Sequence, residues 1–378
     1  MRILYVASDQ RVPGHTGGSV HVLEVARGLA ARGHEVHVVV GRTDGTLDVE
    51  TEPGVVWNRI RWSPPFRYFR FRARKAVAAI AAGFHPEVVI ERYYNFGGEG
   101  LAVARERGIP SLLEVNSPAV DHPGSLKGRL DVMMGRPLRR YREALCRSAA
   151  ALIAPIPEIV PDFARERTEI VTWGANVTAF RPTARSEARR RSLGIPEGAL
   201  AVVFSGSFRP WHGVHVFEAA ARLLHERRDL YFVLVGGPSS GEGVGFRGRR
   251  LGAVAYEAMP EILASADVGV APYDPSRLNQ LRLGFYWSPL KIFEYMASGL
   301  PTVTIARPPL TEIVREGEEG LHVPEGDPRA LALALTRLAE NPSLRARMGA
   351  SARARVVERY SWERHCAQIE GVLRRIVG

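Results

Sequence analysis

A lysine and a glutamate lie three residues apart in a segment that has the signals of a short helix. The segment runs from Ser288 to Gly299 as SPLKIFEYMASG. Proline suits the start of a helix and glycine its end, so Lys291 and Glu294 would share one face. An ammonium group beside a helix N-terminus suits a phosphate, and a carboxylate one turn later can accept from two neighbouring hydroxyls. Lys291 is the only lysine of the second half, which favours a binding site over a surface ion pair.

A second candidate site is the loop from Ser205 to Gly213, which reads SGSFRPWHG. It follows one expected strand and opens the next expected helix, where doubly wound domains bind their ligands. The Arg209 guanidinium can hold two phosphate oxygens at once, and His212 can donate from the start of the helix. The alternative is that Arg209 is only solvated and the aromatic residues of the loop are packing residues.

The first half has a glycine pair at the corresponding place. Gly17 and Gly18 follow the first expected strand and open the first expected helix. Glycine lets the backbone come close to a ligand, and the free N–H groups at a helix start attract an anion. The Gly-x-Gly-x-x-Gly spacing of dinucleotide-binding proteins is absent. A simple turn therefore remains the alternative to a phosphate site.

Short apolar runs alternate with amphipathic segments in both halves, which predicts parallel strands covered by helices. The expected strands are Ile3–Ala7, Val36–Val40, Val88–Ile90, Leu112–Val115, Ala151–Ala154 and Ile170–Thr172, then Ala201–Phe204, Tyr231–Val235, Val268–Ala271, Thr302–Ile305 and Leu321–Val323. The expected helices are Val20–Arg32, Leu126–Ser148, His215–Arg227, Pro289–Ser298, Pro309–Glu316, Pro328–Glu340 and Leu344–Val377, the last restarting at Ser361. The pattern predicts two doubly wound α/β domains with a ligand site in the cleft between them.

The composition is that of a globular protein with an excess of arginine. The 378 residues are 46% apolar and 24% charged, which excludes a wholly disordered chain. The net charge of +11 favours anionic partners, although a general preference for arginine explains much of it equally well. Two distant cysteines, Cys146 and Cys366, argue against a disulfide framework or a cysteine zinc site. With no recognisable signal peptide or spanning segment, we expect a cytoplasmic protein.

Taken together, these motifs resemble the retaining, nucleotide-sugar-dependent glycosyltransferases of family 4, and the resemblance covers essentially the whole chain. It is carried by GGSVHV at the start of the first helix, WGANV at 173–177, FRP at 180–182, the 206–213 loop, residues 259–267 and the 288–299 segment. The resemblance implies the GT-B fold, two Rossmann-like domains facing a central cleft. It also implies a nucleotide-diphosphate sugar as co-substrate, with no cofactor and no metal.

The resemblance also implies a division of the chain. Residues 1–180 would form an N-terminal acceptor-binding domain, 181–196 a linker rich in Gly, Pro and Arg, and 197–360 the C-terminal domain that binds the nucleotide sugar. Residues 361–378 would form a C-terminal helix that can pack back on the first domain.

Site residues follow from the resemblance by position. Arg209, Lys291 and Glu294 are the expected catalytic residues, with Arg209, His212 and Lys291 on the diphosphate and Glu294 on the ribose. The other expected contacts are Gly17 and Gly18 with the phosphates, Ser288, Pro289 and Leu290 with the donor sugar, and Val254 and Met259 with the base.

Two positions depart from the family pattern and leave the donor sugar open. Relatives often carry a glutamate about two helical turns before Glu294, where this chain has Tyr286. Many also have a histidine in the first domain, where Asn116 is the nearest match. Glu91, Arg92 and Asn116, at expected strand ends, are the candidates for the acceptor site. Glu91 and Arg92 could equally be a packed ion pair.

A basic and aromatic stretch runs from Arg59 to Lys75 without an acidic residue. This composition suits the surface of an anionic membrane, so peripheral contact at the inner membrane face is one interpretation. A helix near the acceptor, with solvated arginines, is the other. No nucleic-acid recognition module is evident, and we expect no nucleic-acid partner.

Three functions fit the pattern. The first is a retaining, metal-independent transfer of a sugar from a nucleotide-diphosphate donor to an unidentified acceptor. The second is a nucleotide-sugar epimerase on the same fold, which would need catalytic carboxylates and a histidine in the cleft. The third is a non-catalytic protein that binds a nucleotide sugar. The intact Arg209, Lys291 and Glu294 favour the first.

Overall fold

The computed structural model describes the chain except for residues 15, 62–72, 123, 184–185, 244 and 287, and except for the side chains of 238–240 and 242. The chain forms two compact units. Unit 1 comprises Met1–Trp173, Arg282–Ser288 and Trp362–Gly378. Unit 2 comprises Gly174–Leu281 and Pro289–Ser361. Both units are parallel sheets covered by helices, as the alternating sequence pattern predicts.

The sheet of unit 1 has the strand order β3-β4-β2-β1-β5-β6-β7-β8 over the described residues. All neighbours are parallel except β3 and β4. The strands are β1 (Arg2–Arg11), β2 (Glu35–Gly41), β3 (Val49–Glu52), β4 (Val55–Ile60), β5 (Val88–Arg92), β6 (Ser111–Glu114), β7 (Ala151–Ala154) and β8 (Thr168–Ile170). The central strands are buried on both faces, which explains their near-continuous apolar sequence.

Helices of unit 1 connect these strands and end with the last segment of the chain. They are α1 (Gly17–Ala31), α2 (Ala73–Phe84), α3 (Glu99–Arg107), α4 (Leu126–Met133), α5 (Pro137–Ser148), α6 (Asp162–Arg165) and α14 (Trp362–Val377), with the 3₁₀ turn η3 (Pro157–Ile159). Helix α14 packs against α1, where Gly28 faces the Cys366 side chain. The Arg32 guanidinium donates to Glu370 at 2.5 Å, so the C-terminal helix completes the first unit.

Unit 2 has the strand order β11-β10-β9-β12-β13-β14 within the described residues. The strands are β9 (Leu200–Ser205), β10 (Leu230–Glu242), β11 (Gly248–Gly252), β12 (Val268–Ala271), β13 (Thr302–Ile305) and β14 (Gly320–Val323). The helices are α7 (Glu187–Ser192), α8 (Val214–Leu223), α9 (Met259–Ala264), α10 (Leu290–Ala297), α11 (Leu310–Ile313), α12 (Pro328–Glu340) and α13 (Pro342–Arg359), with the turns η4 (Pro210–His212), η5 (Tyr256–Ala258), η6 (Pro275–Arg277) and η7 (Asn279–Leu283). Buried aromatic rings on β9, α8 and β10 pack in its core in tilted and edge-to-face pairs: Phe204, Phe217 and Phe232.

The sequence prediction of one helix over Leu126–Ser148 is wrong. The structure has two helices, α4 and α5, separated by Met134, Gly135 and Arg136, of which the last two are decisive. Both residues have positive φ, 82° and 64°, a conformation that cannot continue a right-handed helix. The break matters because it sets α4 apart as a separate amphipathic element.

Other boundaries differ less. The expected strand Ile170–Thr172 is β8 at Thr168–Ile170, two residues earlier. The expected restart of the last helix at Ser361 is confirmed, since α13 ends at Arg359 and α14 begins at Trp362. Among the described residues, the structure has no helix both long and apolar enough to cross a membrane.

Candidate functional site

In unit 2, the loop after β9 lies against the first turns of α10. The Tyr295 hydroxyl accepts from the Ser205 backbone N–H at 2.7 Å and lies 3.0 Å from its Oγ. Gly206 follows with a φ of 152°. A Cβ built at Gly206 would lie 2.7 Å from Lys291 Nζ and 3.1 Å from His212 Nδ1. Any side chain there would displace one of the two groups, so glycine leaves the space between them open.

The Lys291 ammonium lies inside this space. Lys291 is the second residue of α10 and is buried. Its Nζ has no hydrogen-bond partner among the described residues. It faces the rings of Phe204 at 4.3 Å and Tyr273 at 5.2 Å, which are weak partners for a cation. Burial lowers the pKa of Lys291 to about 7, although Glu294 opposes the shift.

His212 and Arg209 lie on the other side of Gly206. His212 closes the turn η4, and its buried Nδ1 also has no hydrogen-bond partner in the described part of the chain. Burial, then the nearby Lys291 and Arg209 charges, lower the pKa of His212 to about 2. Its ring is therefore neutral in the free protein near pH 7, where it can form hydrogen bonds without adding a charge. Arg209 itself is exposed, which leaves its guanidinium accessible to a ligand.

Glu294 lies one turn further along α10, as the sequence spacing predicts. Its side chain is buried, and its charge raises the pKa values of Tyr273 and Tyr295 in addition to that of Lys291. Lys291 thus lies close to both Glu294 and His212 in unit 2, beside Gly206.

The remaining predicted donor residues lie at the ends of nearby elements. Pro289 is the N-cap of α10 and Leu290 its first residue. Met259 begins α9 and is buried, and half-buried Val254 precedes η5. Ser288 belongs to unit 1, where its Oγ accepts from the Trp173 backbone N–H at 3.3 Å. No bound nucleotide fixes the roles of these residues, so they stay predictions.

In unit 1, the glycine pair begins α1. The Thr16 side chain caps this helix by accepting from the Ser19 backbone N–H. A Cβ at Gly17 would meet the Trp173 ring at 3.7 Å, and one at Gly18 would clash with Gln10. Gly17 therefore opens toward the Trp173 ring, and a side chain at Gly18 would only require the Gln10 amide to move.

Asn116 lies two residues beyond β6 and is held by the same tryptophan. Its Oδ1 accepts from Trp173 Nε1 at 3.1 Å. Its buried Nδ2 has no hydrogen-bond partner among the described residues. The amide oxygen of Asn116 is therefore used for positioning, and its amide nitrogen is left without a partner among the described residues.

Arg92 and its neighbours form a buried charged network beneath this region. Arg92 lies 3.5 Å from Asp9. Glu114 contacts His21 Nε2 at 2.8 Å and accepts from the Tyr5 hydroxyl at 2.8 Å. Burial alone would raise the pKa of Glu114, but His21 and Arg92 outweigh it and lower the pKa to about 2. Arg92 is thus part of a structural ion network at the carboxyl ends of the strands.

His21, Glu114 and His365 also offer potential metal ligands, because one atom of each lies within 4.8 Å of the others. His365 Nδ1 lies 2.8 Å from the Thr172 carbonyl oxygen, which orients its ring toward the other two. The direct His21–Glu114 contact leaves no room for an ion between those two atoms. We therefore interpret the three residues as a buried structural cluster, joined by the His21–Glu114 contact and by packing of the His21 and His365 rings, whose centroids lie 5.3 Å apart.

Glu91 points away from this network. It accepts from the backbone N–H groups of Gly98 and Leu101 at the start of α3. Burial and the neighbouring Glu99 raise the pKa of Glu91. The carboxyl group thus caps α3, whereas Asn116 keeps an amide nitrogen with no hydrogen-bond partner among the described residues. Tyr286, which stands where relatives often carry a glutamate, is buried in unit 1.

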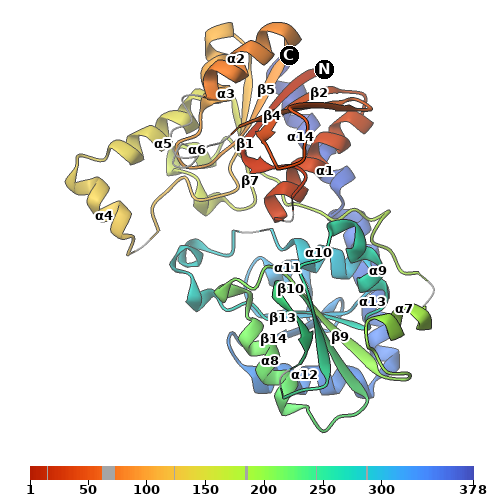
Figure 1. Cartoon of the computed structure of the whole chain (residues 1–378). Helices are drawn as coiled ribbons and strands as arrows, with labels where there is room; N and C mark the ends of the chain where they lie inside the picture. Colours follow the sequence, from red (N-terminus) through yellow and green to blue (C-terminus); the bar gives the residue numbers. More distant parts are fainter. Residues whose placement is uncertain (15, 62–72, 123, 184–185, 244, 287) are drawn as a thin grey trace. The chain divides into compact units, whose positions relative to one another are not determined.

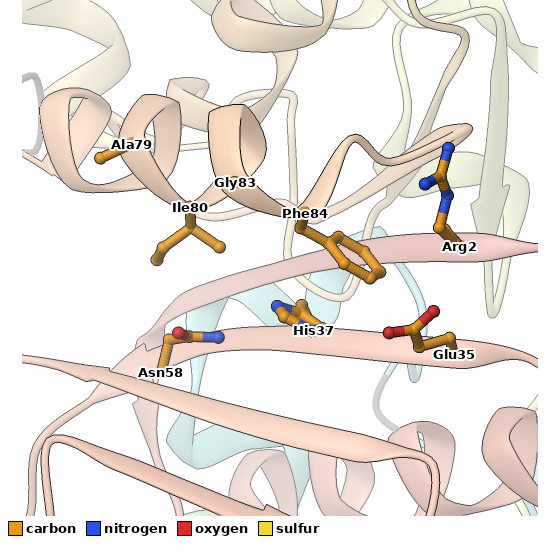
Figure 2. A pocket seen from close by; sticks show the side chains of 8 residues that line it. All are labelled: Arg2, Glu35, His37, Asn58, Ala79, Ile80, Gly83 and Phe84. Atoms are coloured by element: carbon orange, nitrogen blue, oxygen red, sulfur yellow. The ribbon is translucent and has the colours of Figure 1, made fainter.

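A cavity of about 370 Å³ lies elsewhere in unit 1, between α2 and the β1, β2 and β4 strands. Figure 2 shows the His37 and Phe84 rings stacked across it, with centroids 3.7 Å apart. Arg2 and Glu35, the first residues of β1 and β2, line its end. Ligands of doubly wound sheets bind at the carboxyl ends of strands, so this cavity is not part of the candidate site.

Sequence reasoning missed several residues that shape these sites. The main ones are Gly206 and Tyr273 in unit 2 and His21, Glu114 and His365 in unit 1. His21, three residues after the glycine pair, was the available signal in unit 1. The Arg59–Lys75 stretch falls largely on residues 62–72, outside the described residues.

Comparison with known proteins decides the family. Residues 15–174 match the family model described as glycosyltransferase family 4, and residues 199–341 match the model described as glycosyl transferases group 1. A D-inositol 3-phosphate glycosyltransferase of a Nocardioides species is 31% identical, with 97% of this chain and 87% of the relative covered. The chain belongs to glycosyltransferase family 4. The enzyme of the same name from Acidothermus cellulolyticus is 30% identical, covering 96% of this chain and 86% of that one.

Solved structures show the fold of this glycosyltransferase. Sucrose-phosphate synthase from Thermosynechococcus elongatus has a TM-score of 0.76 at 21% identity, covering 99% of this chain and 98% of that one. Anabaena HepE, solved in complex with UDP, has a TM-score of 0.73 at 18% identity, covering 99% and 100%. The predicted GT-B fold and the prediction of a transferase are confirmed. None of the relatives named here is an epimerase or a non-catalytic binding protein.

Proposed function

We propose that this glycosyltransferase moves a sugar from a nucleotide-diphosphate donor to a hydroxyl acceptor with retention of configuration and without a metal ion. The observation that carries the proposal is the buried Lys291 ammonium, which has no hydrogen-bond partner among the described residues and lies at a helix N-terminus. Taking a cation out of water without a partner is unfavourable. An anion bound at this place would remove that penalty.

The donor diphosphate would bind between Arg209 and Lys291, with the neutral His212 as a hydrogen-bonding group. Gly206 supplies the space, because a side chain there would collide with Lys291 and His212. Glu294, one turn along the helix, would accept from the ribose hydroxyls. Val254 and Met259 would contact the base, and Pro289 and Leu290 the sugar.

Charge develops on the leaving phosphate as the bond to the anomeric carbon breaks. Arg209, Lys291 and the α10 N-terminus would stabilise that charge, which is the main electrostatic help for such a step. The acceptor oxygen would then attack the same face of the sugar while its proton passes to the departing phosphate oxygen. No protein base is required in this scheme. The side chains take the place of a metal in balancing charge.

The acceptor side is assigned to unit 1, at the start of α1 and the end of β6. Gly17 exposes backbone there, and Asn116 has a free amide nitrogen among the described contacts. The relatives named above are D-inositol 3-phosphate glycosyltransferases, which makes a phosphorylated polyol the first acceptor to test. Peripheral contact of residues 59–75 with an anionic membrane stays a prediction.

A thermal-shift panel of UDP, GDP and ADP with their sugars tests the donor, because a ligand that binds only the folded state raises its stability. We expect one nucleotide family to raise the melting temperature in wild type and not in Lys291→Met. Turnover with that sugar should persist in EDTA. Loss of turnover in EDTA with recovery on adding Mg²⁺ would refute the metal-independent scheme.

A further inference from the structure

Helix α4 exposes a stripe of large apolar side chains to solvent. Leu126, Leu130, Met133 and Met134 are 73%, 57%, 81% and 65% exposed. Their spacing of four, seven and eight residues places them on one face of a helix. Val132 of the same helix is also exposed, at 55%, but its position in the helix lies off this face, and the other exposed large apolar side chains of the described residues lie on other elements. We call Leu126, Leu130 and Met133 of α4, together with Met134 at its C-cap, the α4 stripe.

The opposite face of α4 fixes this orientation. Gly128 packs on Asp121, where a Cβ would lie 3.1 Å from the Asp121 side chain. Asp131 is buried and accepts from the backbone N–H groups of Leu138 and Arg139 at 2.7 and 2.9 Å. It therefore caps the start of α5 and holds the two helices together. The α4 stripe faces outward because the opposite face of the helix, with Gly128 and Asp131, packs against the rest of unit 1. Figure 1 shows α4 and α5 extending away from the sheet of unit 1.

Positive charge surrounds the stripe. Lys127, which follows Leu126, and Arg129, which precedes Leu130, are both exposed. Arg136 and Arg140 are exposed at the start of α5. From Gly124 to Arg140 the only acidic residue is Asp131, which points inward. The outer face of this segment therefore combines exposed apolar side chains with cations and carries no exposed carboxylate.

We propose that the α4 stripe binds an anionic lipid surface. The four apolar side chains would enter the boundary between headgroups and acyl chains, while the flanking cations contact lipid phosphates. A nucleic acid would use the cations and leave four large apolar side chains in water, which favours lipid. This surface is separate from the Arg59–Lys75 stretch, and it goes beyond the proposed function because it needs no donor or acceptor assignment.

Co-sedimentation of the full chain with vesicles tests the proposal. One vesicle preparation is phosphatidylcholine alone, and the other is phosphatidylcholine mixed with phosphatidylglycerol. The test variant is Leu130→Asp/Met133→Asp, which changes two exposed residues of the stripe. The matched control is Leu333→Asp on α12 of unit 2, where Leu333 is 70% exposed. Thermal shift with the active nucleotide, run in parallel, checks that each variant is folded and reports separately on the proposed function.

The proposal expects binding to the phosphatidylglycerol vesicles that falls with added salt, and at least about tenfold weaker binding in Leu130→Asp/Met133→Asp. Leu333→Asp should bind like wild type. Absence of wild-type binding to either vesicle would overturn the proposal. Equal binding by the double variant would overturn it too, by placing the contact elsewhere. A third outcome would also overturn it: the wild type binds no vesicles but is a dimer in analytical ultracentrifugation, and the double variant is a monomer. The stripe would then be a subunit interface.

Discussion

Two buried charges in this enzyme have opposite surroundings. In unit 1, Glu114 contacts His21 and accepts from the Tyr5 hydroxyl, and its pKa is about 2. In unit 2, Lys291 has no hydrogen-bond partner within the described residues, and its pKa is about 7. A satisfied buried charge stabilises its own network, whereas an unsatisfied one is stable only with a ligand. The comparison separates a structural cluster from a binding site.

The largest expected effect is on folding. Glu114→Ala would leave His21 and Tyr5 without their shared partner inside unit 1. Removing one member of a buried pair costs about 3–5 kcal/mol, so urea denaturation should show a loss of that size. Wild-type stability from this carboxylate is present above its unfolded pKa near 4.5 and should be lost as the pH falls toward about 2. A loss below about 1 kcal/mol would contradict the structural reading.

Arg209→Ala should lower turnover roughly 100-fold or more, because charge on the leaving phosphate is then less stabilised. The effect should appear in kcat more than in KM, since the contact strengthens in the transition state. Arg329→Ala, at an exposed position of α12, is the matched control and should leave both unchanged. Normal turnover in Arg209→Ala would remove Arg209 from the donor site.

Lys291→Met should separate stability from binding. In the folded free enzyme the pKa of Lys291 is lowered from 10.5 to about 7, so the lysine reduces stability progressively as the pH falls from about 10 to 7. Removing it should raise the melting temperature at pH 7 while abolishing the shift caused by nucleotide. A variant both less stable and still able to bind would show that Lys291 is a core residue without a ligand.

Glu294→Gln should weaken nucleotide binding roughly tenfold to a hundredfold, through loss of hydrogen bonds to a charged acceptor. It should also lower the pKa of Lys291 further, because Glu294 holds that pKa up. The pH above which binding weakens should then move down. Calorimetric titrations across pH measure both effects, with Glu312→Gln on α11 as the exposed control.

The smallest expected effect is the uptake of a proton when the nucleotide binds. At pH 8 most Lys291 side chains in the free enzyme are neutral, and a bound diphosphate would restore the charge. Binding should therefore take up close to one proton, about one per nucleotide, and none in Lys291→Met. Calorimetry in buffers of different ionisation enthalpy measures this uptake directly.

Much of the fold could be predicted from the sequence because its central strands are continuous apolar runs between helix signals. The edge strand β3 is short and mostly exposed, and its neighbour β4 alternates buried and half-buried residues; both were missed, as were α2, α3 and β11. The single helix expected over Leu126–Ser148 failed at Gly135-Arg136-Pro137, where a glycine that ends one helix and a proline that starts the next were the local signals. Its apolar residues fit a buried helix equally well, and only the structure shows that they face solvent.

The donor site was more accessible to sequence reasoning than the unit 1 network. Lys291 and Glu294 lie on one helix, so their spacing predicts a shared face. His21, Glu114 and His365 come from α1, β6 and α14, and only tertiary packing brings them together. The missing hydrogen-bond partner of Lys291 among the described residues also could not be predicted, because it depends on how Gly206 and the rings of Phe204 and Tyr273 pack around the ammonium.

A crystal structure with the nucleotide diphosphate that gives the largest thermal shift tests the central claim most directly. The account predicts a phosphate oxygen within hydrogen-bonding distance of Lys291 Nζ, the Arg209 side chain on the same diphosphate, and ribose hydroxyls on Glu294. A nucleotide bound with Lys291 still unpartnered, or bound away from Gly206, would contradict it.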